Sequence, residues 1–313
     1  MLSFIAKRLL AAIPVMALVG LIAFCLLYFS PGDPAVIIAG DMARPEDIAH
    51  IREALGLNAP FYARLWIFFS DILQGDLGTS IFSDRPVTQL ILQRIEPTLS
   101  LAFVTIIISV TIAVPLGALA AWRANGLFDR LAMMAGVIGF SVPVFVVAYL
   151  MIWFFSVQLG WFPVQGYAPL ARGIGPWLYS VILPSLSLST VYIALITRIS
   201  RASVIEVLSQ DYIRTARSKG LTERAVLFRH ALRNAAVPIA TIVGIGIALL
   251  MGGVVVTETA FAIPGIGRLL VDAILQRDYP VIQGVMLFLS AIYVVVNIGV
   301  DISYALFDPR IRK

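Results

Sequence analysis

The stretch Asp211–Pro238, DYIRTARSKGLTERAVLFRHALRNAAVP, is the longest run without a membrane-spanning pattern on the basic side of this chain. Its pattern predicts two helices joined by a tight turn. Lys219 supplies a cation in the last turn of the first helix, and Gly220 can adopt the left-handed conformation that ends a helix. Thr222 can cap the second helix, with Glu223 in the favoured acidic first turn. The stretch therefore predicts a helix, a glycine corner and a capped helix.

Two further features of this stretch concern its second helix. Leu221 before the cap and Val226 at the fourth helical position match a hydrophobic staple, which fixes the angle at which the chain enters a helix. We expect this helix to end before Pro238, where another apolar segment starts. A helical corner between two apolar segments has a shape suited to docking a partner protein.

The composition of the chain is that of a membrane protein. Of its 313 residues 60% are hydrophobic and 13% charged, and the mean hydropathy is +0.94. A soluble domain cannot bury so much apolar surface. The single cysteine, Cys25, lies in the first apolar run, so the sequence holds neither a disulfide framework nor a Cys/His cluster with metal-ligand spacing. We therefore expect an all-α polytopic membrane protein with no metal site.

Residues 1–30 are predicted to form a cytoplasmic N-terminus and the first transmembrane helix. Leu9–Phe29 carries no charge, and a spanning helix needs about 20 apolar residues. A cleaved signal peptide is the alternative, but no small-x-small cleavage site follows the run.

Five more spans are predicted in the remaining chain. They are expected at Thr98–Trp122, Leu131–Val157, Leu178–Arg198, Val237–Thr257 and Val281–Leu306. Prolines are expected to interrupt the second, third and fourth spans, where neighbouring helices can satisfy the freed backbone groups: Pro115, Pro143 and Pro184. Small residues that let helices approach closely occur in the second and fifth spans: Ala113, Gly117, Ala121, Gly252 and Gly253.

The distribution of charge predicts the orientation. With both termini inside, the inner segments hold 15 of the 23 Lys and Arg residues, whereas the outer segments hold 12 of the 18 acidic residues. Because inner loops are enriched in Lys and Arg, both termini are expected in the cytoplasm, as is the loop at about residues 199–236.

Residues 31–97 are predicted to form an extracytoplasmic segment with interfacial helices. Glu46–Leu55 reads as a short helix, and apolar side chains from Phe61 to Ile72 repeat at helical spacing. Residues 98–313 would then form a core of five transmembrane helices, whose last outer segment is Glu258–Pro280.

Motifs for catalysis are absent from the sequence. It contains no G-x-x-x-x-G-K-[S/T] for phosphate, no G-x-S-x-G and no H-E-x-x-H. The two histidines, His50 and His230, fall on opposite sides of the predicted membrane. The main ionisable or amide groups within the spans are Asn297 and Asp301, which are candidates for lining a translocation path. The alternative for Asp301 is a carboxylate near the interface, hydrogen-bonded to a neighbouring helix.

Arg214–Gly220, His230–Asn234 and Pro238 resemble the cytoplasmic EAA loop of ABC importer permeases, in the form found in dipeptide, oligopeptide and nickel permeases. Arg214 stands where the generic loop usually has a glutamate, and the proline comes later after the glycine. Both departures are similar to the peptide and nickel branch. The likeness extends to Pro264–Arg268 and Arg277–Pro280. On residues alone, a basic helix–turn–helix that anchors to anionic lipid or binds DNA is the alternative.

The resemblance implies a type I importer permease with six transmembrane helices, whose loop passes ATPase movement to the pore. Ala216 and Gly220 would allow close approach of the ATPase, and the basic residues would contact its surface. The implied ATPase-coupling residues are Arg214, Thr215, Ala216, Arg217, Lys219, Gly220, Leu221, Thr222, Arg224, His230 and Asn234. Docking of a binding protein would involve Asp33, Asp76, Pro264, Gly265, Arg268, Asp278 and Tyr279.

The same resemblance implies the partners and the location. They are a second homologous permease in a heterodimer, two cytosolic ABC ATPases and an extracytoplasmic substrate-binding protein, in a bacterial or archaeal inner membrane. This chain would hold no cofactor, because the partner ATPases use ATP and Mg. Di- and oligopeptides are the expected cargo, with nickel chelate, glutathione or another small solute as alternatives. A gradient-driven carrier and a membrane-anchored interaction protein are the other classes considered.

Overall fold

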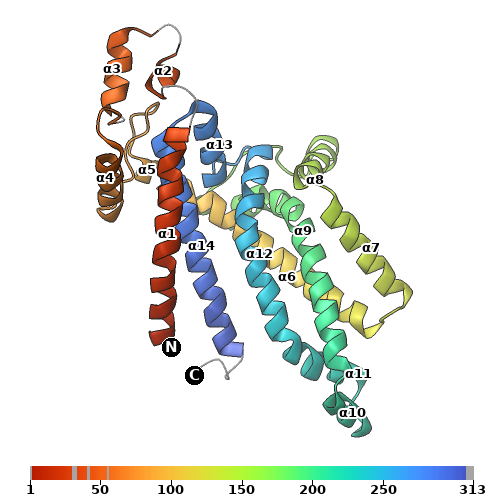
Figure 1. The fold of residues 1–313 in the computed structure, drawn as a ribbon. Coiled ribbons are helices and arrows are strands. Elements are labelled where there is room, and N and C mark those ends of the chain that lie inside the picture. Colours follow the sequence, from red (N-terminus) through yellow and green to blue (C-terminus); the bar gives the residue numbers. More distant parts are fainter. Residues whose placement is uncertain (1, 30–33, 41–42, 55, 308–313) are drawn as a thin grey trace. The chain divides into compact units, whose positions relative to one another are not determined.

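The computed structural model describes residues 2–29, 34–40, 43–54 and 56–307. The chain divides into two compact units, one of Met1–Ile95 with Leu269–Val294 and one of Glu96–Arg268 with Val295–Lys313. We call them unit 1 and unit 2 (Figure 1). The secondary structure of the described residues is helical, apart from an isolated bridge between Thr79 and Pro86.

Unit 1 contains the first apolar helix and the helices that follow it. These are α1 (Leu2–Phe29), α2 (Pro34–Ala39), α3 (Pro45–Ala54), α4 (Phe61–Leu73) and α5 (Val87–Leu92), with most of α13 (Ile266–Gln276) and the first part of α14 (Tyr279–Phe307). The helices predicted from Glu46 and from Phe61 are confirmed as α3 and α4, although Leu55 lies outside the described residues.

Helix α4 packs on α1 through aromatic rings. The ring of Phe24 lies 5.5 Å from that of Phe61 and 5.3 Å from that of Phe68, centroid to centroid. Tyr62 and Trp66, on the other face of α4, are more than 70% exposed. An amphipathic helix with an outward aromatic face is typical of a membrane interface.

Unit 2 is built around one long helix. Its elements are α6 (Ile95–Trp122), α7 (Leu127–Ser141), α8 (Val144–Met151), η1 (Ile152–Gln158), η2 (Leu170–Arg172), α9 (Ile174–Leu208), α10 (Asp211–Ser218), α11 (Glu223–Ala225), η3 (Val226–Ala231) and α12 (Leu232–Ala260). The 35 residues of α9 give a helix about 52 Å long, well beyond the roughly 30 Å of bilayer hydrocarbon. The span expected at Leu178–Arg198 lies within this helix, which continues to Leu208 because no glycine or proline follows Arg198 before that point.

The predicted small-residue face of α6 is confirmed. Ala113 and Ala121 are buried, and Gly117 lies directly on α9. A Cβ atom at Gly117 would lie 2.6 Å from Cβ of Ser200 and 2.7 Å from the carbonyl oxygen of Thr197. The two helices therefore approach at a distance that only glycine permits.

The third predicted span is interrupted at its proline, as expected, whereas Pro115 and Pro184 lie inside continuous helices. Helices α7 and α8 are bent by 98° between Ser141 and Val144, and α8 continues as the π-helical turn η1. Pro143 causes the break, since it lacks a donor and forces Val142 into an extended conformation (φ −84°, ψ 123°). The described residues thus contain five helices long and apolar enough to cross a membrane, or six if the bent pair counts as one span.

The helix after the glycine corner does not end before Pro238, and that prediction is wrong. Residues 223–260 run through α11, η3 and α12 without a break, with Pro238 inside α12. A proline removes only one backbone donor. Ala235 and Ile239, on either side of it, are both buried, so packing holds the helix together.

Candidate functional site

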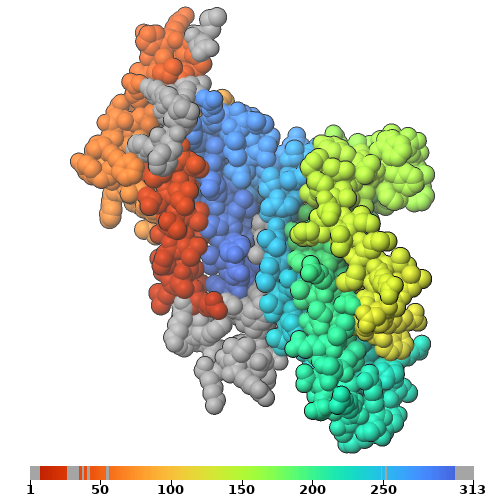
Figure 2. Space-filling model, turned by 45° about the vertical axis from the view of Figure 1, so that its right-hand side comes forward, coloured from red at the N-terminus to blue at the C-terminus, as the bar shows by residue number. Residues whose placement is uncertain are grey.

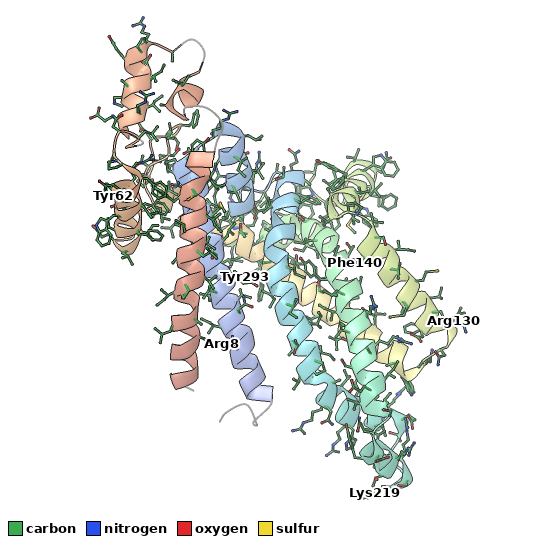
Figure 3. All side chains as sticks on the ribbon, viewed as in Figure 1. Arg8, Tyr62, Arg130, Phe140, Lys219 and Tyr293 are labelled. Carbon is green, nitrogen blue, oxygen red and sulfur yellow. The ribbon has the colours of Figure 1, made fainter. Side chains whose placement is uncertain are left out.

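Helix α10 turns one face inward and the other to solvent. Ile213 is fully buried and Ala216 is 8% exposed, whereas the remaining residues of α10 are exposed. The inward pair has the i, i+3 spacing of one helical face. In Figure 3 Lys219 lies at the tip of this helix, at the end of unit 2. Ala216 is thus buried within its own chain, where its small side chain lets α10 pack closely.

Gly220 forms the corner that was predicted. Its φ is +81°, in the left-handed region, and its amide donates to the carbonyl of Arg217 at 2.9 Å. A Cβ atom at this position would meet nothing within 4 Å. Glycine is therefore required here for its conformation and not for space.

Two side chains fix the far side of the corner. Thr222 Oγ1 accepts from the amide of Ala225 at 3.4 Å, so the predicted cap is confirmed. Arg217 crosses the corner and donates from Nε and Nη2 to the carboxylate of Glu223, at 2.8 and 3.2 Å. Both side chains of this ion pair are about half exposed, so its contribution to stability is below about 1 kcal/mol.

An apolar cluster joins the corner to the long helices of unit 2. Its buried members come from α6, α9, η3 and α12, and they are Ala118, Ala121, Val204, Leu227, Ala231, Ala235 and Ile239. Close-packed interiors deform little, so a push on the corner reaches three long helices together. We call α10, η3 and the residues between them the coupling corner; Figure 2 shows it in green and teal at the end of unit 2.

The structure places the predicted coupling residues on this corner, except Asn234, which lies in the first turn of α12. Arg214, Thr215, Arg217, Lys219, Gly220, Thr222, Arg224 and Asn234 are exposed, and Leu221 and His230 are half-buried. Asn234 donates from Nδ2 to the carbonyl of His230 at 2.8 Å, so the two residues belong to one helical turn.

Sequence reasoning missed two aromatic side chains on the coupling corner. Tyr212 is 44% exposed and Phe228 is 60% exposed. Partial burial raises the pKa of the Tyr212 hydroxyl above its ordinary value, so it remains a hydrogen-bond donor at neutral pH. Phe228, which ends the short run Ala225–Phe228 directly before Arg229 in an otherwise basic stretch, is the signal that could have found this surface.

The docking residues predicted in unit 1 gather around a buried aspartate. Asp278, 3% exposed, accepts from Ser80 Oγ at 2.6 Å and from the amide of Ile81 at 3.3 Å. Nearby, Asp76 accepts from the amide of Gly78 at 2.8 Å, and Tyr279 is 8% exposed. A cavity of about 640 Å³ lies beside this turn, lined in part by α4 and α14. Asp33 lies outside the described residues.

The docking residues predicted in unit 2 surround a glutamate that sequence reasoning did not single out. Glu258 is fully buried and accepts from Thr98 Oγ1 at 2.6 Å and from the amide of Arg268 at 2.9 Å. Thr98 Oγ1 in turn accepts from the amide of Ile266 at 2.8 Å. The carboxylate thus caps the first turn of α13. A Cβ atom at Gly265 would lie 2.0 Å from Glu258 Oε1, so only glycine fits there. Pro264, beside it, is exposed.

The two residues predicted to line a path lie on α14, one turn apart. Asn297 is half-buried, and the side chain of Asp301 lies outside the described residues. Within the described residues, no group of three His, Cys, Asp or Glu side chains could hold a metal ion.

Comparison with known proteins assigns the family. Residues 113–313 match the model described as "Binding-protein-dependent transport system inner membrane component", and residues 1–102 match that of its N-terminal part. The chain is 52% identical to "Probable peptide ABC transporter permease protein y4tP" of Sinorhizobium fredii, over 99% of each chain. It is 43% identical to "Glutathione transport system permease protein GsiC" of Escherichia coli, over 100% of this chain and 99% of that one.

The fold agrees with this assignment. A chain from inward-facing structures of the MetNI methionine ABC transporter matches with a TM-score of 0.61, covering 71% of this chain and 97% of that chain at 18% identity. Taken with the bent span and the coupling corner, these matches show the type I importer permease fold. The chain therefore belongs to the inner-membrane components of binding-protein-dependent transport systems, as a non-catalytic permease subunit of an ABC importer.

Proposed function

We propose that this permease carries di- and oligopeptides, and that its coupling corner is where the ATPases act on it. Two features of the coupling corner together carry the proposal. Its outer face is exposed and basic, and its inner face belongs to the apolar cluster shared with α6, α9 and α12. A surface that only bound lipid headgroups would need the basic face, but it would not need to pack against three long helices.

The mechanism follows from that combination. When two ATPases close on ATP, the groove that holds α10 moves. The coupling corner follows as a rigid piece, because Ile213 of α10 and Val226 and Leu227 of η3 are buried within their own chain. Because the apolar cluster beneath the coupling corner includes residues of α6, α9 and α12, displacement of the corner tilts these three helices together. The tilt switches a central path between inward-facing and outward-facing states.

The exposed residues of the coupling corner would make two kinds of contact with the ATPases. Lys219, Arg214 and Arg224 offer charge to the ATPase surface, whereas Tyr212 and Phe228 offer the aromatic contact area that anchors interfaces. Ala216 and Ile213 are buried on the inner face of α10, where they hold this helix against the rest of its own chain.

The proposed assembly is a heterodimer of this chain with a related permease, because six spans enclose a path poorly alone. Both termini and the coupling corner lie in the cytoplasm, which agrees with the bias of Lys and Arg toward those segments. The turns around Asp278 and Pro264 then face the binding protein. They would present a fixed backbone, since Asp278 and Glu258 are both buried and hydrogen-bonded.

Relatives support the choice of cargo. The names of the similar proteins refer to peptide transport in Sinorhizobium fredii and to glutathione transport in Escherichia coli. Glutathione is itself a small peptide, so it is the second candidate, and uptake of radiolabelled dialanine and of glutathione by the whole transporter separates the two. If dialanine is taken up and an excess of an ordinary tripeptide blocks that uptake, the first candidate is supported. If glutathione is taken up and dialanine is not, the second candidate is supported.

A pull-down tests the coupling corner. Tagged wild-type chain, Gly220→Val and Gly220→Asn are co-expressed with the neighbouring transporter genes and purified in mild detergent. We expect the ATPases and the second permease with wild type and with Gly220→Asn, since asparagine tolerates positive φ. Gly220→Val should retain the second permease and lose the ATPases. Equal recovery of ATPases with all three chains would contradict the proposal.

A further inference from the structure

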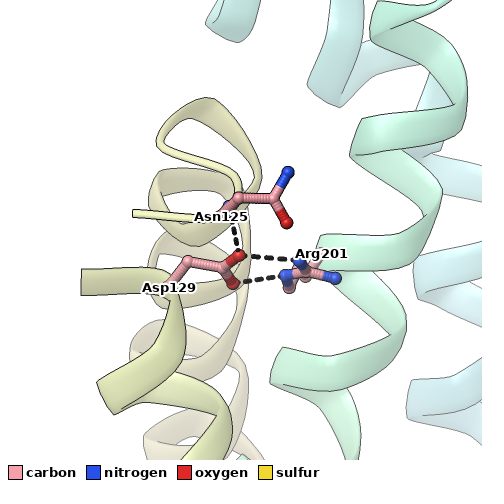
Figure 4. Close-up of polar contacts among 3 residues, drawn as sticks. All are labelled: Asn125, Asp129 and Arg201. Atoms are coloured by element: carbon pink, nitrogen blue, oxygen red, sulfur yellow. Dashed lines mark hydrogen bonds and ion pairs between the residues drawn. The ribbon is translucent and has the colours of Figure 1, made fainter. Parts of the chain in front are cut away.

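An ion pair near the coupling corner is not explained by the function proposed so far. Asp129, in the first turn of α7, is 3% exposed and faces Arg201 of α9 (Figure 4). Arg201 donates from Nε to Oδ1 and from Nη2 to Oδ2 of Asp129, the latter at 2.7 Å. The amide of Asn125 donates to the same Oδ2 at 2.8 Å. The carboxylate is thus held by three donors.

Such a pair is a poor device for stability alone. Burying a carboxylate costs several kcal/mol, and a well-packed apolar pair of similar size often holds two helices at least as well. What a bidentate pair supplies is a fixed geometry, because two parallel hydrogen bonds allow one orientation of the guanidinium. Helices joined by apolar contact alone can slide over one another, as shear motions show.

The position of Arg201 explains why a fixed geometry matters. It lies seven residues before the end of α9 at Leu208, and α10 begins three residues after that end, at Asp211. Just before Arg201 in the chain, Thr197 and Ser200 lie against Gly117 of α6. The last turns of α9 are therefore held on one side by α6 and on the other by α7.

We propose that the Asp129–Arg201 pair transmits displacement of the coupling corner to the bent span α7–α8. Helix α7 also follows α6 through a short turn and packs along α9, but the residues that join the coupling corner to the long helices come from α6, α9, η3 and α12 and none from α7. The pair adds a hydrogen-bonded link of fixed geometry between α9 and α7. Asp129 and Arg201 are thus positioning residues of the transport cycle. This inference rests on the proposed coupling function.

The first test uses the complete transporter, with its ATPases, second permease and binding protein, in liposomes. The variants are Asp129→Asn, Arg201→Gln and the exchanged pair Asp129→Arg/Arg201→Asp. The matched control is Arg198→Gln, because Arg198 is exposed on α9 one turn before Arg201. The readouts are dialanine transported per ATP hydrolysed, the melting temperature, and the amount of ATPase that co-purifies.

Each single variant should lower the ratio of transport to hydrolysis by about tenfold with unchanged ATPase recovery. The exchanged pair should return the ratio to within about threefold of wild type, and the control should match wild type. A ratio unchanged in both single variants would overturn the proposal, whatever their melting temperatures. Equal recovery of the ATPases with wild type and with Gly220→Val would instead overturn the proposed coupling function, so the two failures differ.

A distance measurement keeps the test decisive if the single variants fold poorly. Spin labels are placed at Leu131 of α7 and at Ser209 after α9, both exposed, with Cys25 replaced by alanine. In the wild-type transporter the distance between the labels should be the same without nucleotide and with ATP and vanadate. In Asp129→Asn it should differ between the two states. A distance that changes with nucleotide in the wild type would overturn the proposal.

Discussion

Gly220 and Gly265 are both required glycines, but for opposite reasons. Gly220 has a φ of +81° and open space where a side chain would be. Gly265 lies against the carboxylate of Glu258, which a Cβ atom would approach to 2.0 Å. The first glycine shapes the chain, and the second leaves room for a buried charge. A position of the first kind can be read from local sequence, whereas one of the second kind depends on a residue elsewhere in the fold.

The largest effect is expected from Gly265→Ala. The new methyl group would collide with a side chain that Thr98 and the Arg268 amide already hold, so the free energy of unfolding should fall by about 2–3 kcal/mol. Thermal unfolding of the detergent-purified subunit measures it. Gly252→Ala is the control, since nothing lies within 4 Å of a Cβ there. Equal melting temperatures for the two variants would show that the carboxylate is not held where it is described.

A second variant tests whether the collision involves the carboxylate. Glu258→Gln should itself lower the free energy of unfolding by about 1–3 kcal/mol, because a charged acceptor of buried donors is replaced. Glu258→Ala removes the obstacle altogether. Gly265→Ala should therefore cost little in that background, and a double-mutant cycle on melting temperatures measures the difference. If the effects of Gly265→Ala and Glu258→Ala on the melting temperature simply added, the collision with the Glu258 side chain would not be the cause of the destabilisation.

Gly220→Val should cost less stability and more transport. A β-branched residue in the left-handed region costs roughly 1–2 kcal/mol, confined to an exposed corner. Uptake by the whole transporter should fall severalfold while the subunit still inserts into the membrane, and Gly220→Asn should transport nearly normally. Quantifying the membrane-inserted chain beside uptake checks this, and parallel losses of both would count against a coupling role.

The smallest effect is expected from Arg217→Gln. The Arg217–Glu223 pair is about half exposed, so its loss should lower the free energy of unfolding by less than about 1 kcal/mol. The effect on thermal unfolding should shrink further at high salt. A drop in melting temperature as large as that of Gly265→Ala would show that the coupling corner is held mainly by this pair.

These cases also show what the sequence could predict. The helices, the glycine corner and its Thr222 cap depend on neighbours in the chain, and the structure has them where they were expected. The interruption of the third span at Pro143 was expected and is present. The continuous helix at Pro238 was predicted wrongly, because a proline alone does not decide whether a helix ends. Around Pro238 the buried residues on either side decided it.

The remaining features come from contacts between distant residues. Glu258 meets Thr98 across 160 positions, and Arg201 meets Asp129 across 72. Neither pair has a local signal, since the partners share no helix and no turn. For the same reason the Pro264–Arg268 turn could be predicted only from its resemblance to a family. The buried Glu258 beside that turn was not predicted.

The separation between Thr98 and Glu258 also bears on how the protein is made. At about 5–20 residues per second, the ribosome adds Glu258 on the order of ten seconds after Thr98. During that interval the start of α6 sits in the membrane without the partner that later fixes it. A chain stopped before Glu258 can never form this contact, so its formation shows that synthesis has passed the end of α12, with α13 and α14 still to follow.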